Sequence, residues 1–304
     1  MSLKSNSFTT TNLQRENHSK SKKERISTSL SMILMIVMAA YFLFPLYWLL
    51  VAMTKSTNQL FTTSMLAFPE HLSLMANLKW LNSYQDGMFW RWVLNSVIYA
   101  VGAGLLGTLV SSMAGYSLAK YVFKGKNFLT VAVLGSLMIP GAALAIPVFL
   151  MIKSLGLINT YAGVLLPMIV NPFGVYFMMV FIKESMPNEL IDSGRVDGAS
   201  DYGIFFRIAL PIIRPGLVTL FLITFIGSWN NFFLPLVLLN KTSLYPLTVG
   251  LQIWTANLNA AGTGQPLYPL ILIGSFLSIL PMLIMFPILR KHIVSGIAMG
   301  GVKS

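Results

Sequence analysis

Long stretches without a charged residue alternate with short polar segments along the chain. A helix needs about 20 predominantly apolar residues to cross a lipid bilayer. Six stretches meet this requirement, and they cover residues 30–53, 92–118, 128–152, 161–181, 216–239 and 269–289. The pattern therefore predicts an all-α polytopic membrane protein with six transmembrane helices.

The first apolar stretch is preceded by a polar tail and is too long for a cleaved signal peptide. Ser27 to Thr54 carries no charge, whereas the hydrophobic part of a signal peptide has roughly 7–15 residues. We therefore expect a retained first transmembrane helix over residues 29–54. Residues 1–28 are rich in Ser, Asn, Thr and Lys. We expect them to form a disordered tail, because they bury too little apolar surface to offset chain entropy.

The other five predicted helices form a core over residues 90–290, and a second polar tail follows at 291–304. The charge-free stretch 242–289 is longer than one span requires. Its first half contains Pro, Gly and Asn, which break helices. We therefore interpret residues 241–267 as a loop outside the membrane that precedes the last helix.

Small residues and prolines inside the predicted spans bear on helix packing. Pro140 and Pro147 should kink the third span because proline removes a backbone donor. The kink serves either as part of a gate or as a fixed bend. In the second span, small residues at every fourth position allow a neighbouring backbone to approach closely, unless they recur by chance in a helix rich in Gly and Ala. These residues are Ala103, Gly107, Ser111, Gly115 and Ala119.

The distribution of basic residues predicts the orientation of the chain. Segments on the cytoplasmic side of membrane proteins carry an excess of Lys and Arg. If the N-terminus lies inside, sixteen Lys and Arg fall on inside segments and five on outside segments. Both termini are therefore expected in the cytoplasm, together with the loop 183–215.

The composition agrees with a membrane protein and argues against several kinds of site. Hydrophobic residues make up 55% of the chain and charged residues 10%, whereas soluble domains carry about 25% charged residues. The net charge of +12 does not predict a nucleic-acid partner, because the basic residues lie between apolar runs and form no patch. The chain has no Cys, and its three His lie in distant polar segments, so we expect no metal site.

Two other functional classes are less consistent with the residues. No Asp, Glu, Lys or Arg falls within a predicted span. A secondary carrier usually keeps an ionisable or cation-binding group near the midplane of the membrane. An integral-membrane enzyme needs a constellation of Asp, Glu or His at one membrane face, and the acidic residues cluster only in the loop 183–215. We therefore expect no catalytic residues.

The loop 183–215 is too long for a simple connector and too apolar for a free tail. Ser185 can cap a helix that has Pro187 in its first turn, and Gly198 offers a left-handed stop. Ser200 can cap a second short helix, which Pro211 is expected to end. The loop thus predicts a helix, a sharp turn and a helix beneath the membrane. Its small and acidic residues suit close approach by a partner with a basic groove.

At these residues the chain resembles the permease subunits of ABC importers. Their cytoplasmic motif is Glu-Ala-Ala, three residues, Gly, nine residues, Ile, one residue and Leu-Pro. Here Asp192-Ser193-Gly194 occupies the first three places, so none of the Glu-Ala-Ala residues is kept literally. The alternative is a surface helix pair without a partner. The resemblance implies an ATPase-coupling loop with the residues Glu189, Asp192, Ser193, Gly194, Asp197, Gly198, Ala199, Ile208, Leu210 and Pro211.

The resemblance covers roughly residues 30–304 and extends to the second permease of carbohydrate importers of the maltose-transporter type. It implies the ABC importer type I permease fold, with both termini in the cytoplasm. The segments that carry it are 44–48, 95–96, 114–120, 157–161, 195–200, 229–232 and 296–303.

The same resemblance implies which partners the chain works with. The chain contains no phosphate-binding Gly-x-x-x-x-Gly-Lys-Ser/Thr sequence, so we expect ATP and Mg²⁺ to be bound by partner subunits and no cofactor to be bound here. The implied partners are a second homologous permease, two nucleotide-binding ATPase subunits and an external sugar-binding protein. The implied function is ATP-driven import of a carbohydrate across the bacterial cytoplasmic membrane. A non-sugar solute is the alternative substrate.

Four residues are candidates for the translocation pathway. Asn side chains bind sugar hydroxyls, aromatic rings stack on a pyranose, and amides at membrane depth should face protein or water. The alternative is that the amides bond to neighbouring helices. We favour that alternative for Asn230 and Asn231, since in maltose-type importers the sugar site lies mainly in the other permease. The candidates are Asn95, Trp229, Asn230 and Asn231.

The resemblance also implies roles for two remaining segments. The loop 241–267 would contact the sugar-binding protein, or else serve as a passive connector. The C-terminal tail, with Gly296, Gly300 and Gly301, would thread between the ATPase subunits because small residues permit entry into a narrow interface. A disordered end is the alternative.

Overall fold

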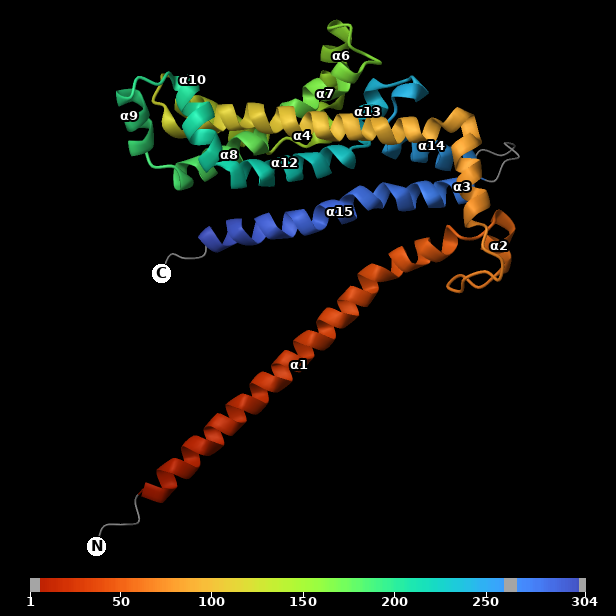
Figure 1. Ribbon diagram of the computed structural model, residues 1–304, viewed down its shortest axis with the longest axis horizontal. Coiled ribbons are helices and arrows are strands. Elements are labelled where there is room, and N and C mark those ends of the chain that lie inside the picture. Colours follow the sequence, from red (N-terminus) through yellow and green to blue (C-terminus); the bar gives the residue numbers. More distant parts are fainter. Residues whose placement is uncertain (1–5, 260–266, 301–304) are drawn as a thin grey trace. The chain divides into compact units, whose positions relative to one another are not determined.

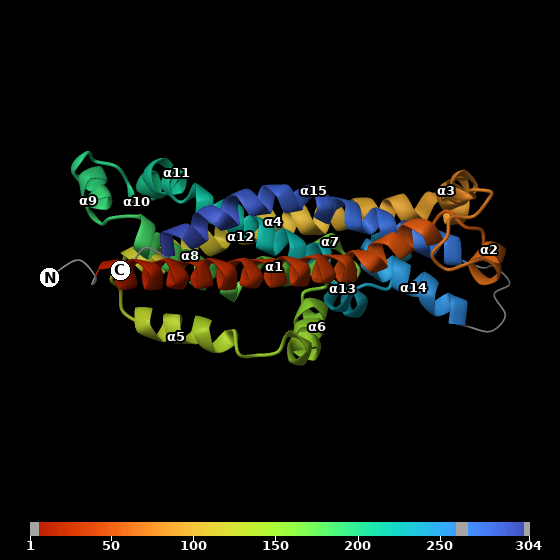
Figure 2. The same cartoon turned by 90° about the horizontal axis from the view of Figure 1, so that it is seen from below.

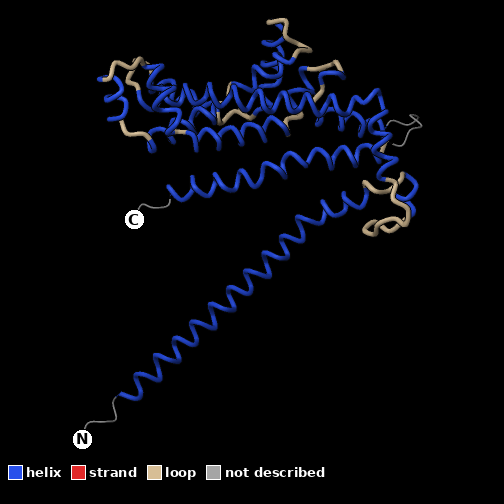
Figure 3. Tube along the Cα trace, viewed as in Figure 1, coloured by secondary structure: helices blue, strands red, loops and turns tan. Residues whose placement is uncertain are grey.

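The computed structural model describes residues 6–259 and 267–300, with the side chains of residues 28–258, 267–285 and 287. Helices joined by loops make up the described chain, and no strand occurs within it (Figure 3). The prediction of an all-α fold is therefore confirmed. By its internal contacts the chain divides into two units, Met1–Leu74 and Met75–Ser304.

The first unit contains α1 (Asn6–Ala52) and α2 (Thr57–Thr62). α1 begins at Asn6, far ahead of the predicted span and within the segment expected to be a tail. Residues 6–44 contain neither Gly nor Pro. The helix of the apolar span can therefore propagate toward the N-terminus, where each added residue gains a hydrogen bond without a new nucleation cost.

The second unit carries the remaining helices, including those that form the site described below. Figures 1 and 2 show them from two directions. In chain order they are α3 (Leu74–Ser83), η1 (Tyr84–Gly87), α4 (Met88–Lys120), α5 (Lys126–Ser136), η2 (Gly141–Leu144), α6 (Ala145–Ser154), α7 (Tyr161–Ile169), α8 (Pro172–Ser185), α9 (Glu189–Val196), α10 (Asp201–Gly203), η3 (Ile204–Ala209), α11 (Leu210–Ile212), α12 (Arg214–Trp229), α13 (Phe233–Leu238), η4 (Thr242–Leu244), α14 (Leu247–Asn259) and α15 (Tyr268–Gly300).

α4 is the central helix of the second unit, and α8 and α12 lie along it (Figure 1). The stripe of small residues on α4 makes these contacts. A Cβ atom on Gly115 would stand 2.9 Å from the carbonyl oxygen of Val175 in α8, and one on Gly107 would stand 3.6 Å from Thr224 Cγ2 in α12. The predicted close packing is therefore confirmed, because side chains at these positions would hold the helix backbones apart.

The third predicted span is broken rather than merely kinked. α5 and the η2–α6 segment meet at 105°. Pro140 stands at this break, immediately before η2, where it cannot donate a helical hydrogen bond. Pro147 lies in the first turn of α6, a position that tolerates proline, so the kink expected there is absent.

The fourth and fifth predicted spans are each interrupted as well. Asn171 separates α7 from α8 and caps α8, with its Oδ1 accepting a hydrogen bond from Gly174 N at 3.0 Å. α12 ends at Trp229 and α13 begins at Phe233. The continuous helix expected over residues 216–239 is therefore wrong in its middle.

Much of the segment 241–267, which was expected to be a loop, is helical. Within this segment α14 covers Leu247–Asn259 and packs on α4. A Cβ atom on Gly250 would stand 2.1 Å from Trp92 Cε3, and Trp254 is only 1% exposed. The carbonyl of Pro246 accepts the first helical hydrogen bond, from Gly250 N at 3.0 Å. A proline is tolerated at this position because the N–H that it lacks would have no partner within the helix. Residues 260–266 lie outside the described residues.

Four helices of the described chain are long and apolar enough to cross a membrane, or up to six if each of two bent pairs counts as one span. The second bent pair, Asp201–Ile212 and Arg214–Trp229, turns by 81°. The four candidates that need no such pairing are Thr28–Ala52, Leu74–Lys120, Tyr161–Ser185 and Tyr268–Met285.

Candidate functional site

The loop 183–215 folds into a helical hairpin at one end of the second unit, between α8 and α12 (Figure 1). The hairpin consists of residues 189–212, with α9 as its first arm and α10, η3 and α11 as its second. The predicted sequence of helix, sharp turn and helix is therefore confirmed.

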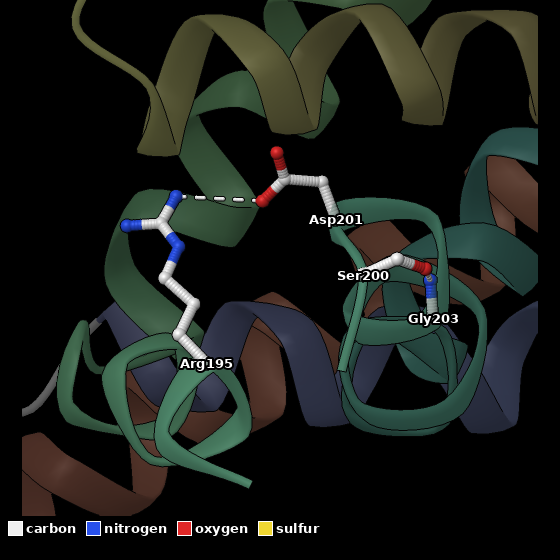
Figure 4. Close-up of polar contacts among 4 residues, drawn as sticks. All are labelled: Arg195, Ser200, Asp201 and Gly203. Carbon is white, nitrogen blue, oxygen red and sulfur yellow. Dashed lines mark hydrogen bonds and ion pairs between the residues drawn. The ribbon is translucent and has the colours of Figure 1, made fainter. Parts of the chain in front are cut away.

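The turn between the two arms is formed by the backbone around Gly198, whose φ of +76° lies in the left-handed region. Ala199 N donates to Gly194 O at 2.9 Å and Gly198 N donates to Arg195 O at 3.0 Å. This is the Schellman pattern, which satisfies the last carbonyls of a helix. Ser200 then caps the second arm, with its Oγ accepting from Gly203 N at 3.2 Å (Figure 4).

Two details of the predicted hairpin are corrected. Ser185 caps no helix, because its hydroxyl donates to Phe181 O at 2.6 Å within α8, and α9 begins at Glu189 instead. Pro211 does not end the second arm, which continues to Ile212. Proline has no N–H to donate to the preceding turn. The wider π-turn of η3, in which Leu210 N donates to Phe205 O, lets the helix continue past Pro211.

One face of α9 is buried against the second arm, and the other is exposed. Ile191 is 4% exposed, and a Cβ atom on Gly194 would stand 2.9 Å from Ile208 Cδ1 and 3.2 Å from Ile204 Cγ1. Among the motif residues, Gly194 and Ile208 therefore hold the arms together. The exposed face carries Glu189, Asp192, Ser193, Asp197 and Gly198.

Each arm of the hairpin also exposes an apolar side chain that the motif did not indicate. Val196 is 87% exposed and Tyr202 is 73% exposed. Such residues lie outside the fixed places of the motif, and only the structure identifies them as exposed.

Arg195 and Asp201 connect the two arms across the turn, with Nη2 and Oδ1 3.4 Å apart (Figure 4). Both side chains are at least half exposed, so the pair contributes little to stability. The Arg195 guanidinium also lies 5.9 Å from the ring centroid of Tyr121, at the end of α4. Burial raises the pKa of the Tyr121 hydroxyl above its ordinary value, so this group stays neutral at pH 7.

Lys120 fastens the hairpin to the end of α4. Its ammonium donates to Met186 O and to Asn188 Oδ1, the latter at 3.0 Å. These acceptors lie immediately before α9. Sequence reasoning missed this role, because Lys120 lies 66 residues from Met186 in the chain.

A cluster of buried apolar side chains joins the second arm to the same helices. Met178 and Ile182 of α8 pack with Ile204, Phe205 and Ala209 of η3 in one core. The hairpin therefore shares one apolar core with α8 and, through Tyr116, with α4.

The break between α12 and α13 holds three of the four pathway candidates. Trp229 is buried, and its Nε1 donates to Ser278 O of α15 at 3.2 Å. Asn231 Oδ1 accepts from Leu234 N at 3.2 Å and so starts α13. Asn230 is exposed, and its Nδ2 donates to Ile226 O at 3.0 Å. The three residues therefore lie at a helix break, and Asn230 is the one whose side chain is open to its surroundings.

Asn95, the fourth candidate, is fully buried and bonded within the protein. Its Nδ2 donates to Ser243 O at 3.0 Å and Tyr245 O at 2.9 Å, and its Oδ1 accepts from the Tyr161 hydroxyl at 2.6 Å. This geometry favours the structural alternative, in which Asn95 joins α4, α7 and the segment around η4.

A polar cluster at the break between α7 and α8 was not predicted. Asn171 Nδ2 donates to Thr224 Oγ1 of α12 at 3.2 Å, and the Ser111 hydroxyl of α4 donates to Asn171 O at 3.4 Å. The pair Asn171-Pro172 is the sequence signal that marks this break, since proline disfavours helical backbone in the residue before it.

The C-terminal tail is described only as backbone. α15 continues through Gly296 to Gly300, so the helix extends well beyond the predicted end of the last span at residue 289. Gly301 lies outside the described residues.

Apolar helices long enough to cross a membrane, several of them interrupted, together with a helical hairpin at one end, are consistent with a membrane transport subunit. The chain matches the family of the binding-protein-dependent transport system inner membrane component over residues 107–298, and it belongs to this family. It is thus a multi-pass permease of the ABC importer class and not an enzyme.

Individual relatives cover nearly the whole chain. The arabinooligosaccharides transport system permease protein of Halalkalibacterium halodurans is 36% identical, over 92% of this chain and 99% of the relative. The lactose transport system permease protein of Rhizobium radiobacter is 31% identical, over 86% and 91%. A solved bacterial ABC transporter involved in the import of the acidic polysaccharide alginate is similar in fold. Its TM-score is 0.76 at 22% identity, with 88% of this chain and 97% of that chain covered.

Proposed function

We propose that the chain is the transmembrane permease subunit of an ATP-driven importer of carbohydrates, with oligosaccharides as the preferred substrates. The family assignment carries the transport function. The relatives named for arabinooligosaccharides and lactose support the substrate class. The partners in this proposal are a second homologous permease, two nucleotide-binding ATPase subunits and an external sugar-binding protein.

The proposed topology has six spans and both termini in the cytoplasm of a bacterium. It counts α5 with η2 and α6 as one span and α12 with α13 as another, so that the second arm of the hairpin stays outside the membrane. The excess of Lys and Arg on the segments assigned to the inside supports this orientation. The hairpin then lies on the cytoplasmic side, where ATP is available.

The hairpin is proposed as the mechanical connection to the ATPases. Its exposed face, with Asp192 and Asp197 beside Val196, supports docking into a groove of basic and apolar character. Since the hairpin packs on α4 and α8, closure of the nucleotide-binding pair would move these helices together. The result is a two-state switch between an outward-open and an inward-open cavity, biased by nucleotide.

The helix breaks are proposed to line the translocation pathway. Non-helical backbone at membrane depth is tolerated only where it is buried in protein or lines a water-filled cavity. Asn230 stands at such a break and exposes its amide. It is therefore the residue of this chain that we assign to the pathway, whereas Asn95, Trp229 and Asn231 position the helices around it.

The test is co-expression of the chain with its neighbouring transport genes, followed by purification in mild detergent and reconstitution in proteoliposomes. The proposal expects ATPase subunits to co-purify. It also expects ATP hydrolysis to rise when binding protein and an oligosaccharide are added together, but not when a polyol or amino acid replaces the sugar. Solute uptake without ATP or without co-purified ATPase would refute the proposal.

A further inference from the structure

A groove of about 770 Å³ lies between α5 and α8, near the end of the helices from which the hairpin emerges. Figure 2 shows the two helices and the adjacent hairpin. The groove is separate from the break at Asn230 and from the exposed face of α9. Neither the coupling of the hairpin nor the proposed pathway involves the groove, so its role is a separate one.

The groove combines a polar and mainly basic part with an apolar part. The polar part carries Lys126 and Asn127 at the start of α5 and Lys183 at the end of α8. The apolar part carries Val131 and Met179, one turn or more farther along the same helices. A ligand that fits both parts has a polar anionic group at one end and a hydrocarbon chain at the other.

The two lysines remain available for such an anionic group. Lys126 Nζ donates to Tyr121 O at 3.0 Å, and an ammonium has two further protons to donate. Lys183 is exposed, and within the described side chains neither lysine forms an ion pair. Glu184 also lines the groove. The first turn of α5 adds partial positive charge from the helix dipole, so the groove as a whole favours an anion.

The surroundings of the groove match a lipid rather than a soluble ligand. On α5, Phe128 is 75% exposed and Val131 is 66% exposed. Apolar residues this exposed on a membrane helix face lipid chains or another helix. A lipid molecule could therefore place its acyl chains along α5 without leaving the bilayer while its headgroup reaches the lysines.

We propose that this groove binds the headgroup of an anionic phospholipid, with the phosphodiester between Lys126 and Lys183 and an acyl chain along Val131 and Met179. Basic pockets between membrane helices on the cytoplasmic side suit such headgroups. The bound lipid would fill the space between α5 and α8 and hold together two helices that flank the hairpin.

The test uses the full co-purified assembly and phosphatidylglycerol as the probe. Native mass spectrometry counts bound phosphatidylglycerol as its concentration is raised in detergent, with phosphatidylcholine as the zwitterionic comparison. Lys183→Gln should weaken phosphatidylglycerol binding roughly fivefold or more, because each basic residue near a membrane surface contributes appreciably to anionic-lipid binding. The neighbouring substitution Glu184→Gln should strengthen it. Lys153→Gln, outside the groove, should change nothing.

The opposite signs of the two adjacent substitutions keep the proposal falsifiable. Loss of binding in both variants, or no change in either, would overturn it, since misfolding acts alike on both. Inorganic phosphate at 10 mM, a deliberately high concentration, distinguishes a lipid headgroup from free phosphate as the bound anion. Displacement of phosphatidylglycerol would assign the groove to free phosphate and refute the lipid proposal. Equal retention of phosphatidylcholine would also refute it. Co-elution of the ATPases with each variant checks the fold.

Discussion

Gly194 of α9 and Ile208 of η3 are in such close contact that a Cβ atom on Gly194 would stand 2.9 Å from Ile208 Cδ1. Both residues occupy places in the motif that placed the chain among ABC importer permeases. At least part of the motif's spacing therefore records how the two arms of the hairpin pack. The residues that remain open to a partner, such as Asp192 and Ser193, lie on the opposite face of α9.

Gly194→Ala should cost about 1 kcal/mol of stability, at the lower end for an overpacked core site, because Ile208 Cδ1 is the far end of a side chain that can move. Gly194→Ala combined with Ile208→Val should recover part of this loss, since valine lacks the clashing methyl. Thermal unfolding of the four members of this double-mutant cycle measures the coupling. Gly203→Ala is the matched control, as its added methyl meets Ser200 Oγ only at 3.3 Å. Equal losses for the two single alanine variants would contradict the contact.

Gly198→Val should uncouple the ATPases from transport. The φ of +76° costs a residue with a side chain about 1–2 kcal/mol, and no neighbour lies within 4 Å of the added Cβ, so the effect comes from the backbone alone. Gly198→Asn is the control, because asparagine accepts left-handed backbone. ATPase activity stimulated by binding protein and sugar should fall in the valine variant and persist in the asparagine variant. Wild-type stimulation with valine would defeat the assignment of the hairpin as the coupling element.

Asp192→Lys should weaken docking without affecting the fold. The side chain is exposed, and surface substitutions away from special features usually change stability by less than about 0.5 kcal/mol. If the ATPase groove is basic, a like charge should reduce ATPase binding about tenfold or more. Asp192→Glu keeps the carboxylate and restores the longer side chain usual at this place in the family, and it should bind at least as tightly. The measurement is the amount of ATPase retained by the purified permease as salt is raised, and equal retention by both variants would refute the role of the charge.

The sequence predicted the helical class and the hairpin because both depend on local patterns. Gly198 and Ser200 signal a stop and a cap through their own backbone and side-chain chemistry. The position of Lys120 and the burial of α14 depend instead on contacts between distant segments. Trp92 and Gly250 are 158 residues apart, and their contact overrides the helix-breaking composition around α14. The breaks within the fourth and fifth spans were missed because hydropathy records length and polarity but not continuity.

Asn95→Leu should destabilise the second unit by several kcal/mol. It leaves two carbonyls and the Tyr161 hydroxyl without their partner, and each buried unpaired group costs about 1–3 kcal/mol. Tyr161→Phe removes one of the three bonds and should cost a fraction as much. Thermal aggregation of the detergent-solubilised permease measures both. Normal stability of the leucine variant together with altered substrate preference would show that Asn95 belongs to the translocation pathway and is not a structural residue.

Asn230→Ala should lower sugar transport while leaving stability and ATPase docking unchanged. The side chain is exposed at the end of α12, and its bond to Ile226 O lies within its own helix. Its removal therefore breaks no contact between helices. Asn231→Ala is the informative comparison, because Asn231 Oδ1 starts α13 by accepting from Leu234 N. Loss of this cap should cost about 1 kcal/mol and lower the melting temperature. Uptake of radiolabelled oligosaccharide into proteoliposomes, measured alongside thermal unfolding, separates the two effects. A permease that loses stability but keeps its uptake rate per folded molecule in the Asn230→Ala variant would show that this asparagine supports the helix break and does not contact the solute.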